Sequence, residues 1–219
     1  AAELLRLAGE NELEADVLAT LANLMIGRRH FSAAENLAQG TLASEPDHLS
    51  ANLVVAACAR DRGALDLAES SLATVLAAHP ESAAGHSSLG MLRLEQDRLE
   101  EAATAFETAV NLNSEEAINP QRWGECLRLM GHLEEAEVAF TEALRRQPDY
   151  PEALFRLALV QGETGDSESA CKLLQRLLEI NPDHVETRFN LGFHRLRSGQ
   201  LAAGWPLYEA RWQIPEAPA

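Results

Sequence analysis

Small and apolar residues recur along the chain with a period of 34 residues. In each period a small residue directly follows a large apolar one, and a second small residue stands twelve positions later. The first register comprises Ala22, Ala56, Gly90, Gly124, Ala158 and Gly192, and the second comprises Ala34, Ala68, Ala102, Ala136, Ala170 and Gly204. Small residues allow two helix backbones to approach closely. The pattern therefore predicts an antiparallel pair of helices in each period, repeated along the chain.

Glycine and proline predict where these helices end. Glycine stands at the middle of four periods, at Gly63, Gly131, Gly165 and Gly199, where it suits a left-handed turn after the first helix. Proline cannot continue a helix, and it recurs at Pro46, Pro80, Pro148 and Pro182, with Ser114 in the remaining place. Asp47, Asp149 and Asp183 follow three of these prolines and are predicted N-caps of the next helix. We expect about thirteen helices, no strand, and turns between units near residues 46, 80, 114, 148 and 182.

These registers resemble the tetratricopeptide repeat (TPR) family, most clearly in residues 83–112 and 123–150. The resemblance divides residues 15–218 into six units, namely 15–48, 49–82, 83–116, 117–150, 151–184 and 185–218. Residues 1–8 resemble the second helix of a truncated earlier repeat, so residues 1–14 are expected to be its end and a linker. The pattern is weaker in residues 49–82, and Asn113, Ser114 and Glu115 replace one proline turn. Pro120 is expected in the first turn of the following helix.

The resemblance implies an all-α, right-handed superhelical solenoid of helix hairpins. Its concave groove would be lined mainly by the first helix of each hairpin, and its function would be to bind other proteins. Chaperone-binding members carry a clamp of lysine and asparagine residues for a terminal carboxylate. Asn23 alone matches such a place here, so that particular function is disfavoured.

Two positions on each first helix are expected to face the groove, four residues apart. They hold mixed side chains in the early units, but Phe155 with Leu159 and Phe189 with Phe193 in the last two, so these pairs should stack across adjacent units. Four arginines are expected around this apolar zone: Arg122, Arg128, Arg156 and Arg197. One interpretation is a site for an apolar peptide or helix with an acidic flank. The other is that each ring packs against its own hairpin.

The last unit differs from the others in its aromatic residues. Trp205, Tyr208 and Trp212 are spaced to share one helical face, and Trp205 stands where three earlier units have glutamate. This face is predicted to contact something outside the array, although Pro206 could instead turn Trp205 inward to close the core. Residues 204–212 also resemble the last repeat of bacterial arrays that precede a glycosyltransferase-like domain.

Composition narrows the partners. The 34 acidic residues outnumber the 18 basic ones and give a net charge of −16, which disfavours nucleic acid and anionic membranes. Cys58, Cys126 and Cys171 are odd in number and lack metal-ligand spacing, which favours a reduced, cytoplasmic setting. No membrane span or signal peptide is recognisable. Since the chain starts at Ala1 without a methionine, an upstream segment could have been removed.

The sequence contains no pattern typical of catalysis. Most of its 7 histidines fall in expected turns, and nucleophile, phosphate-loop and metal motifs are missing. We therefore expect no enzyme activity, no cofactor and no metal. The leading hypothesis is a scaffold that binds a protein or peptide in the groove. The alternatives are a substrate-selecting or regulatory arm of a bacterial glycosyltransferase-like enzyme, and self-association through the ends of the array.

Overall fold

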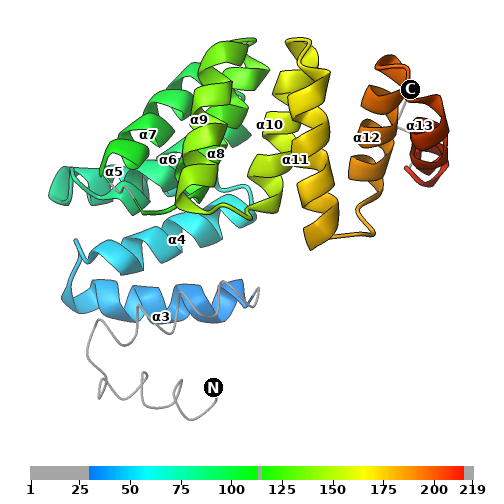
Figure 1. Ribbon diagram of the computed structural model, residues 1–219. Coiled ribbons are helices and arrows are strands. Elements are labelled where there is room, and N and C mark those ends of the chain that lie inside the picture. Colours follow the sequence, from blue (N-terminus) through cyan, green and yellow to red (C-terminus); the bar gives the residue numbers. More distant parts are fainter. Residues whose placement is uncertain (1–29, 113–114, 215–219) are drawn as a thin grey trace. The chain divides into compact units, whose positions relative to one another are not determined.

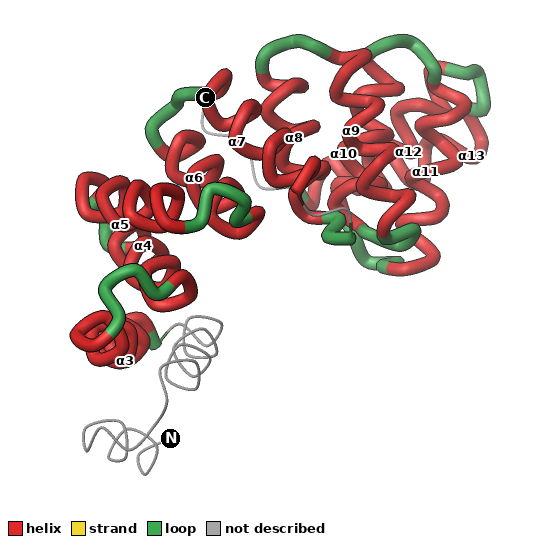
Figure 2. Tube along the Cα trace, turned by 90° about the vertical axis from the view of Figure 1, so that its left-hand side faces the viewer, coloured by secondary structure: helices red, strands yellow, loops and turns green. Residues whose placement is uncertain are grey.

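The computed structural model describes residues 30–112 and 115–214, and within them it contains α-helices, one 3-10 helix and no strand (Figures 1 and 2). The predicted all-α class is therefore confirmed. The chain divides into two compact units, Ala1–Asn113 and Ser114–Ala219, and each is treated by itself below. The expectations for residues 1–14, for Asn23 and for the first helix of 15–48 fall outside the described residues.

In the first unit α3 precedes two helical hairpins. The helices are α3 (Phe31–Ser44), α4 (Leu49–Asp61), α5 (Leu65–Ala78), α6 (Ala83–Glu95) and α7 (Leu99–Leu112). Helix α4 pairs with α5 and α6 pairs with α7, while α3 packs on α4 and α5 packs on α6. The core accordingly runs from hairpin to hairpin, with alanine, valine and leucine as its main components.

The second unit contains three hairpins in succession. They are α8 (Ile118–Leu129) with α9 (Leu133–Arg146), α10 (Pro151–Glu163) with α11 (Ser167–Ile180), and α12 (Val185–Arg197) with α13 (Leu201–Tyr208). A 3-10 helix, η1 (Glu209–Gln213), follows α13 and packs back on α12. Figure 1 shows α10 to α13 lying one after another in chain order, from yellow to red.

The helices of a hairpin meet where a small residue of the first faces a large residue of the second. A Cβ atom on Gly90 would lie 2.8 Å from the ring of Phe106, and one on Gly124 would lie 2.9 Å from the ring of Phe140. Both phenylalanines are fully buried. Real Cβ atoms do not approach other atoms this closely, so each buried ring requires glycine opposite it.

In two other hairpins the large residue of the second helix is leucine instead of phenylalanine. Where the facing residue is Leu72 or Leu174, the small position holds Ala56 or Ala158. Interiors are packed closely enough that a single added methyl group must be offset by a loss of volume elsewhere. Glycine faces phenylalanine in some hairpins and alanine faces leucine in others, so the combined volume of the two facing side chains is similar in these hairpins.

The turns inside the hairpins follow the glycine pattern with one exception. Gly63, Gly131, Gly165 and Gly199 all have positive φ angles, as their places at the helix ends predict. Asp97 stands at the same register in α6–α7 and also takes a left-handed conformation, with φ of 58°. Aspartate tolerates this region better than most residues. The hairpin thus imposes the backbone conformation even where the sequence lacks glycine.

The predicted aspartate N-caps are wrong. His48 and His184 cap α4 and α12 instead, because their Nδ1 atoms accept hydrogen bonds from the backbone of Ala51 at 3.3 Å and Thr187 at 3.2 Å. The aspartates lie one residue too early to reach these N–H groups. Asp149 accepts hydrogen bonds from Arg176 instead.

Replacing Ala136 by leucine tests the close approach within the α8–α9 hairpin. Ala136 is completely buried beside Phe140, so the extra methylene groups have no space and should cost about 1–3 kcal/mol of unfolding free energy. Urea denaturation followed by circular dichroism measures the loss. Ala73→Leu on the exposed side of α5 is the control, and an equal effect of both changes would contradict the assigned register.

Candidate binding site on the first helices

A stripe of half-exposed side chains runs along the first helix of every described hairpin. In the first unit it comprises Leu53, Ala57, Ser87 and Met91, and in the second unit Gln121, Glu125, Phe155, Leu159, Phe189 and Phe193. All are half-buried except Phe193, which is 44% exposed. Buried residues flank them on the same helices, such as Leu154 and Ala158 on α10. The expected groove positions are therefore the partly exposed ones, on the side of each helix that does not pack into the core.

Phe155, Leu159, Phe189 and Phe193 form the apolar part of this stripe and are called the aromatic row. Among the described residues no ring contact joins the two pairs, and their stacking along one groove stays a prediction. Phe155 packs against His184 instead, with ring centroids 5.5 Å apart, and Phe189 against Tyr208 at 5.3 Å. His184 caps α12 and so places its ring beside Phe155. The rings are supported from the side and keep part of their surface open.

The arginines expected around the row are partly neutralised. Glu125 lies 3.0 Å from Arg128 and 3.5 Å from Arg156, and its hydrogen bond raises the pKa of the Arg128 guanidinium. Arg197 donates a hydrogen bond to the carbonyl of Gly162 at 3.3 Å. Arg122 lies half-buried on α8. One carboxylate thus holds two of the four arginines, which fixes their positions and lowers the net positive charge beside the row.

His194 is a buried residue that the sequence analysis overlooked. It is only 4% exposed, although it stands at a register that holds Val160, Cys126 and Leu92 in earlier units. Its Nδ1 atom lies 3.2 Å from the hydroxyl oxygen of Ser167. Burial, assisted by the charge of Arg197, lowers the pKa of His194.

Gly162 makes the space for this imidazole ring. A Cβ atom at Gly162 would lie 2.5 Å from Cε1 of His194, so no larger residue fits. Earlier units have Arg128, Leu94 and Arg60 at this place. Aligning the units in the sequence could have found this pair. Gly162 is smaller than the residues at its place in earlier units, and His194, at its own place in the next unit, is more polar than its counterparts.

The aromatic residues at the end of the array have different environments. Trp205 is 53% exposed and Trp212 is 77% exposed, while Tyr208 is half-buried. The α-helix continues through Pro206, and Trp205 does not turn inward. The chain changes to the tighter 3-10 helix at Glu209, so Trp212 does not continue the α-helical spacing of Trp205 and Tyr208. The contact of these three residues with something outside the array stays a prediction. We call Trp205, Tyr208, Arg211 and Trp212 the end face.

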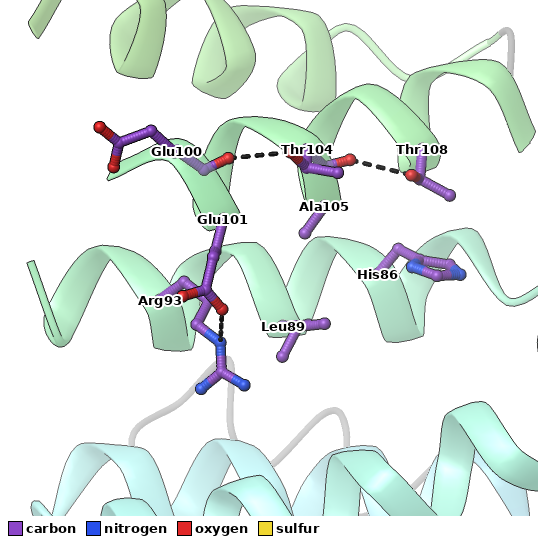
Figure 3. A pocket seen from close by; sticks show the side chains of 8 residues that line it. All are labelled: His86, Leu89, Arg93, Glu100, Glu101, Thr104, Ala105 and Thr108. Atoms are coloured by element: carbon purple, nitrogen blue, oxygen red, sulfur yellow. Dashed lines mark hydrogen bonds and ion pairs between the residues drawn. The ribbon is translucent and has the colours of Figure 1, made fainter. Parts of the chain in front are cut away.

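A pocket of about 410 Å³ lies on the α6–α7 hairpin (Figure 3). Its lining residues are His86, Leu89, Arg93, Glu100, Glu101, Thr104, Ala105 and Thr108. Arg93 is held by Glu69 at 2.8 Å and by Glu101 at 3.2 Å. Thr104 and Thr108 donate their hydroxyl protons to carbonyls of their own helix. Arg93, Glu101 and the two threonines of the pocket wall therefore interact with partners within the fold.

Burial determines the reactivity of the Cys126 thiol. Burial raises the pKa of the Cys126 thiol to about 11, so this group stays protonated and unreactive at neutral pH.

Among the residues that the structure describes, no three histidine, cysteine or acidic side chains are grouped so as to hold a metal ion. None of the described helices is long and apolar enough to cross a membrane.

Family models agree with the repeat pattern. Two models, both described as tetratricopeptide repeat, match the chain: one at residues 19–73 and 66–119, the other at residues 127–186. Together the matches span most of the sequence. The chain belongs to the tetratricopeptide repeat family. No curated protein is similar enough in sequence to be called a relative of this TPR protein.

Solved structures show the same fold. PilF of Pseudomonas aeruginosa is 16% identical with a TM-score of 0.83, and the match covers 93% of each chain. PilW, described as a type IV pilus biogenesis factor, is 22% identical with a TM-score of 0.77, covering 91% of this chain and 92% of PilW. YrrB, described as a TPR protein with an unusual peptide-binding site, is 21% identical with a TM-score of 0.62, covering 92% of this chain and all of YrrB. At such identities the likeness concerns the fold alone.

The family models do not extend to the last repeat. The matched family models end at residue 186, so the resemblance of residues 204–212 to arrays that precede a glycosyltransferase-like domain stays a prediction.

Stability should respond to acid through His194. Because the folded protein lowers the pKa of this imidazole, protons bind the unfolded chain preferentially below its ordinary value of about 6.5. The free energy of unfolding should therefore decrease as the pH falls from 7.5 to 5. His194→Leu should reduce this decrease, and urea titrations at several pH values measure the difference. Identical pH profiles for both proteins would show that His194 does not carry the effect.

A double-mutant cycle tests the fit of Gly162 to His194. Gly162→Ala alone should destabilise the protein by about 1–3 kcal/mol, because the new methyl group overlaps the imidazole. Combined with His194→Ala, the same change should cost much less, since the ring is gone. Thermal unfolding of the four proteins gives the coupling energy, and additive effects would argue against direct contact.

Proposed function

We propose that this TPR protein is a non-catalytic scaffold that binds a peptide or a partner domain through the aromatic row. The observation that carries the proposal is the partial exposure of four large apolar side chains on adjacent first helices, with Phe193 44% exposed. Exposed apolar clusters on otherwise well-packed proteins mark interaction surfaces more often than isolated exposed residues do. Fold likeness to a TPR protein described as having a peptide-binding site is consistent with this use.

The row favours a ligand with large apolar side chains. Its phenyl rings have few ways to reorient, because His184 and Tyr208 support Phe155 and Phe189 from the side. Rings that are ordered before binding lose little conformational freedom when a ligand covers them. Arg128 and Arg156 share Glu125, so an acidic group on the ligand would compete with this carboxylate. We therefore infer that apolar contacts provide most of the affinity and that charge sets the orientation.

We also propose a division of the chain into repeats, which assigns the aromatic row to particular units. The bounds of α4 to α13 support units at 49–82, 83–116, 117–150, 151–184 and 185–218, each with one first helix. Under this division the aromatic row belongs to the last two units.

Replacing Phe189 and Phe193 together by alanine should weaken binding at least tenfold. Burying each phenyl ring contributes about 1.5–3 kcal/mol, and 1.4 kcal/mol corresponds to a factor of ten in affinity. The immobilised protein and its variants would be exposed to an extract of the source cells, and mass spectrometry would quantify the retained proteins. Proteins bound by the unaltered chain should be lost from the double variant.

Val138→Ala is the matched control. Val138 is 65% exposed on α9, a second helix, and so offers apolar surface outside the row. This variant should retain the same proteins as the unaltered chain. Circular dichroism would verify that the double variant keeps its helices. A folded double variant that retains the same set of proteins would rule out the aromatic row as the binding surface.

A further inference from the structure

The end face repeats a packing surface that is occupied one unit earlier. There, Cys171, Leu174 and Leu178 of α11 belong to one hydrophobic cluster with Leu191 of the following helix α12. Trp205 and Tyr208 of α13 stand 34 residues after Cys171 and Leu174, and Trp212 follows on η1. Hence α13 presents, with larger side chains, part of the surface on which the preceding hairpin receives a helix.

No described helix covers this surface in the last hairpin. Leu174 is fully buried, whereas Trp205 is 53% exposed and Trp212 is 77% exposed. The rings are nevertheless held in place, since Trp205 packs edge-on against Tyr208, with centroids 5.9 Å apart, and Tyr208 packs against Phe189. An ordered surface of this kind is ready to receive a helix at a small cost in conformational freedom.

Arg211 gives the end face its charge. Its guanidinium group lies between two rings, with Cζ 4.6 Å from the centroid of Tyr208 and 4.4 Å from that of Trp212. Within residues 115–214, its only hydrogen bond runs from Nη1 to the carbonyl of Tyr208 at 3.4 Å, and it forms no ion pair there. Guanidinium groups stacked in this way keep their N–H edges free for a carboxylate.

Arg188 adds a second positive charge to the same side of the hairpin. Its Nη2 atom donates to Gln213 of η1 at 3.0 Å, and its Nε atom is buried without a partner among the described residues. Arg188 and Arg211 thus place two positive charges beside the end face, although the whole chain has a net charge of −16.

We propose that the end face binds an amphipathic α-helix of a partner protein, which docks as α12 docks on the α10–α11 hairpin. The helix would place leucine or a similar side chain against Trp205 and Tyr208, and an aspartate or glutamate against Arg211. The repeated register supplies the geometry, and the stacked arginine supplies the preference for an acidic helix. The end face lies on α13 and η1, whereas the aromatic row lies on α10 and α12, and the two surfaces meet where Tyr208 packs against Phe189. The proposal does not depend on the function proposed above.

A second copy of the chain is a poorer occupant. If two end faces met across a two-fold axis, the interface would contain Arg188 and Arg211 of both copies, and an excess of like charges in a partly buried interface is costly.

Selection from a peptide library tests the proposal. The probe is a phage-displayed library of 18-residue helical peptides, randomised on one face and selected against the full chain. Peptides that bind should carry large apolar residues at helical spacing and an adjacent aspartate or glutamate. Chemically synthesised winners should bind the Trp205→Ala/Trp212→Ala chain at least tenfold more weakly, as measured by isothermal titration calorimetry. Arg211→Glu should weaken them at least tenfold, and a peptide with lysine for its acidic residue should recover part of the loss.

Phe155→Ala distinguishes this site from the aromatic row. Peptides of the end face should bind this variant with unchanged affinity, whatever the outcome for the row. A selection that yields no peptide dependent on Trp205 and Trp212, or one without acidic preference, would overturn the proposal. So would sedimentation that shows dimers of the unaltered chain and monomers of the tryptophan variant, because a second copy would then cover the face.

Discussion

The close approach of two helices within each hairpin is the constraint on which the rest of this protein depends. The summed volume of the two facing residues stays nearly constant, as Gly90 with Phe106 and Ala56 with Leu72 illustrate. Because interiors are packed near the density of organic crystals, this sum fixes the distance between the helix axes. Each hairpin then presents a similar surface to the next, and stacking can continue from one hairpin to the next.

The same constraint separates residues for packing from residues for binding. A first helix must place its small residue against its own partner and its large apolar residue toward the preceding hairpin, as Leu157 and Leu191 do. The remaining side of the helix has no packing duty, so its side chains can change from Ser87 and Met91 to Phe155 and Leu159 without altering the hairpin. Binding specificity in such an array can therefore vary while the architecture is preserved.

The sequence predicted the helices and turns well because both follow from local rules that recur in every unit. Even Asp97, which breaks the glycine pattern, keeps the left-handed turn that the register demands. The wrong predictions concern details of local backbone geometry that the 34-residue period does not determine. The aspartate caps failed by one residue, and the change to a 3-10 helix at Glu209, which alters the spacing of Trp212, was not foreseen. The half-exposure of the aromatic row followed from register, but the partners of its rings did not, since His184, the N-cap of α12, contacts Phe155 on α10.

The contact between Gly162 and His194 bears on how this array can have changed through gene duplication and recombination. The two residues belong to successive hairpins, so neither is compatible with an arbitrary neighbour. If the segment carrying Gly162 were copied in front of a unit with Cys126 or Leu92 at the matching place, the site would lack the volume of an imidazole. If His194 followed a unit with Arg128 or Leu94 at the place of Gly162, the imidazole ring would overlap the arginine or leucine side chain. These two hairpins must therefore be inherited together and in this order, so the repeats at this end of the protein are not interchangeable modules.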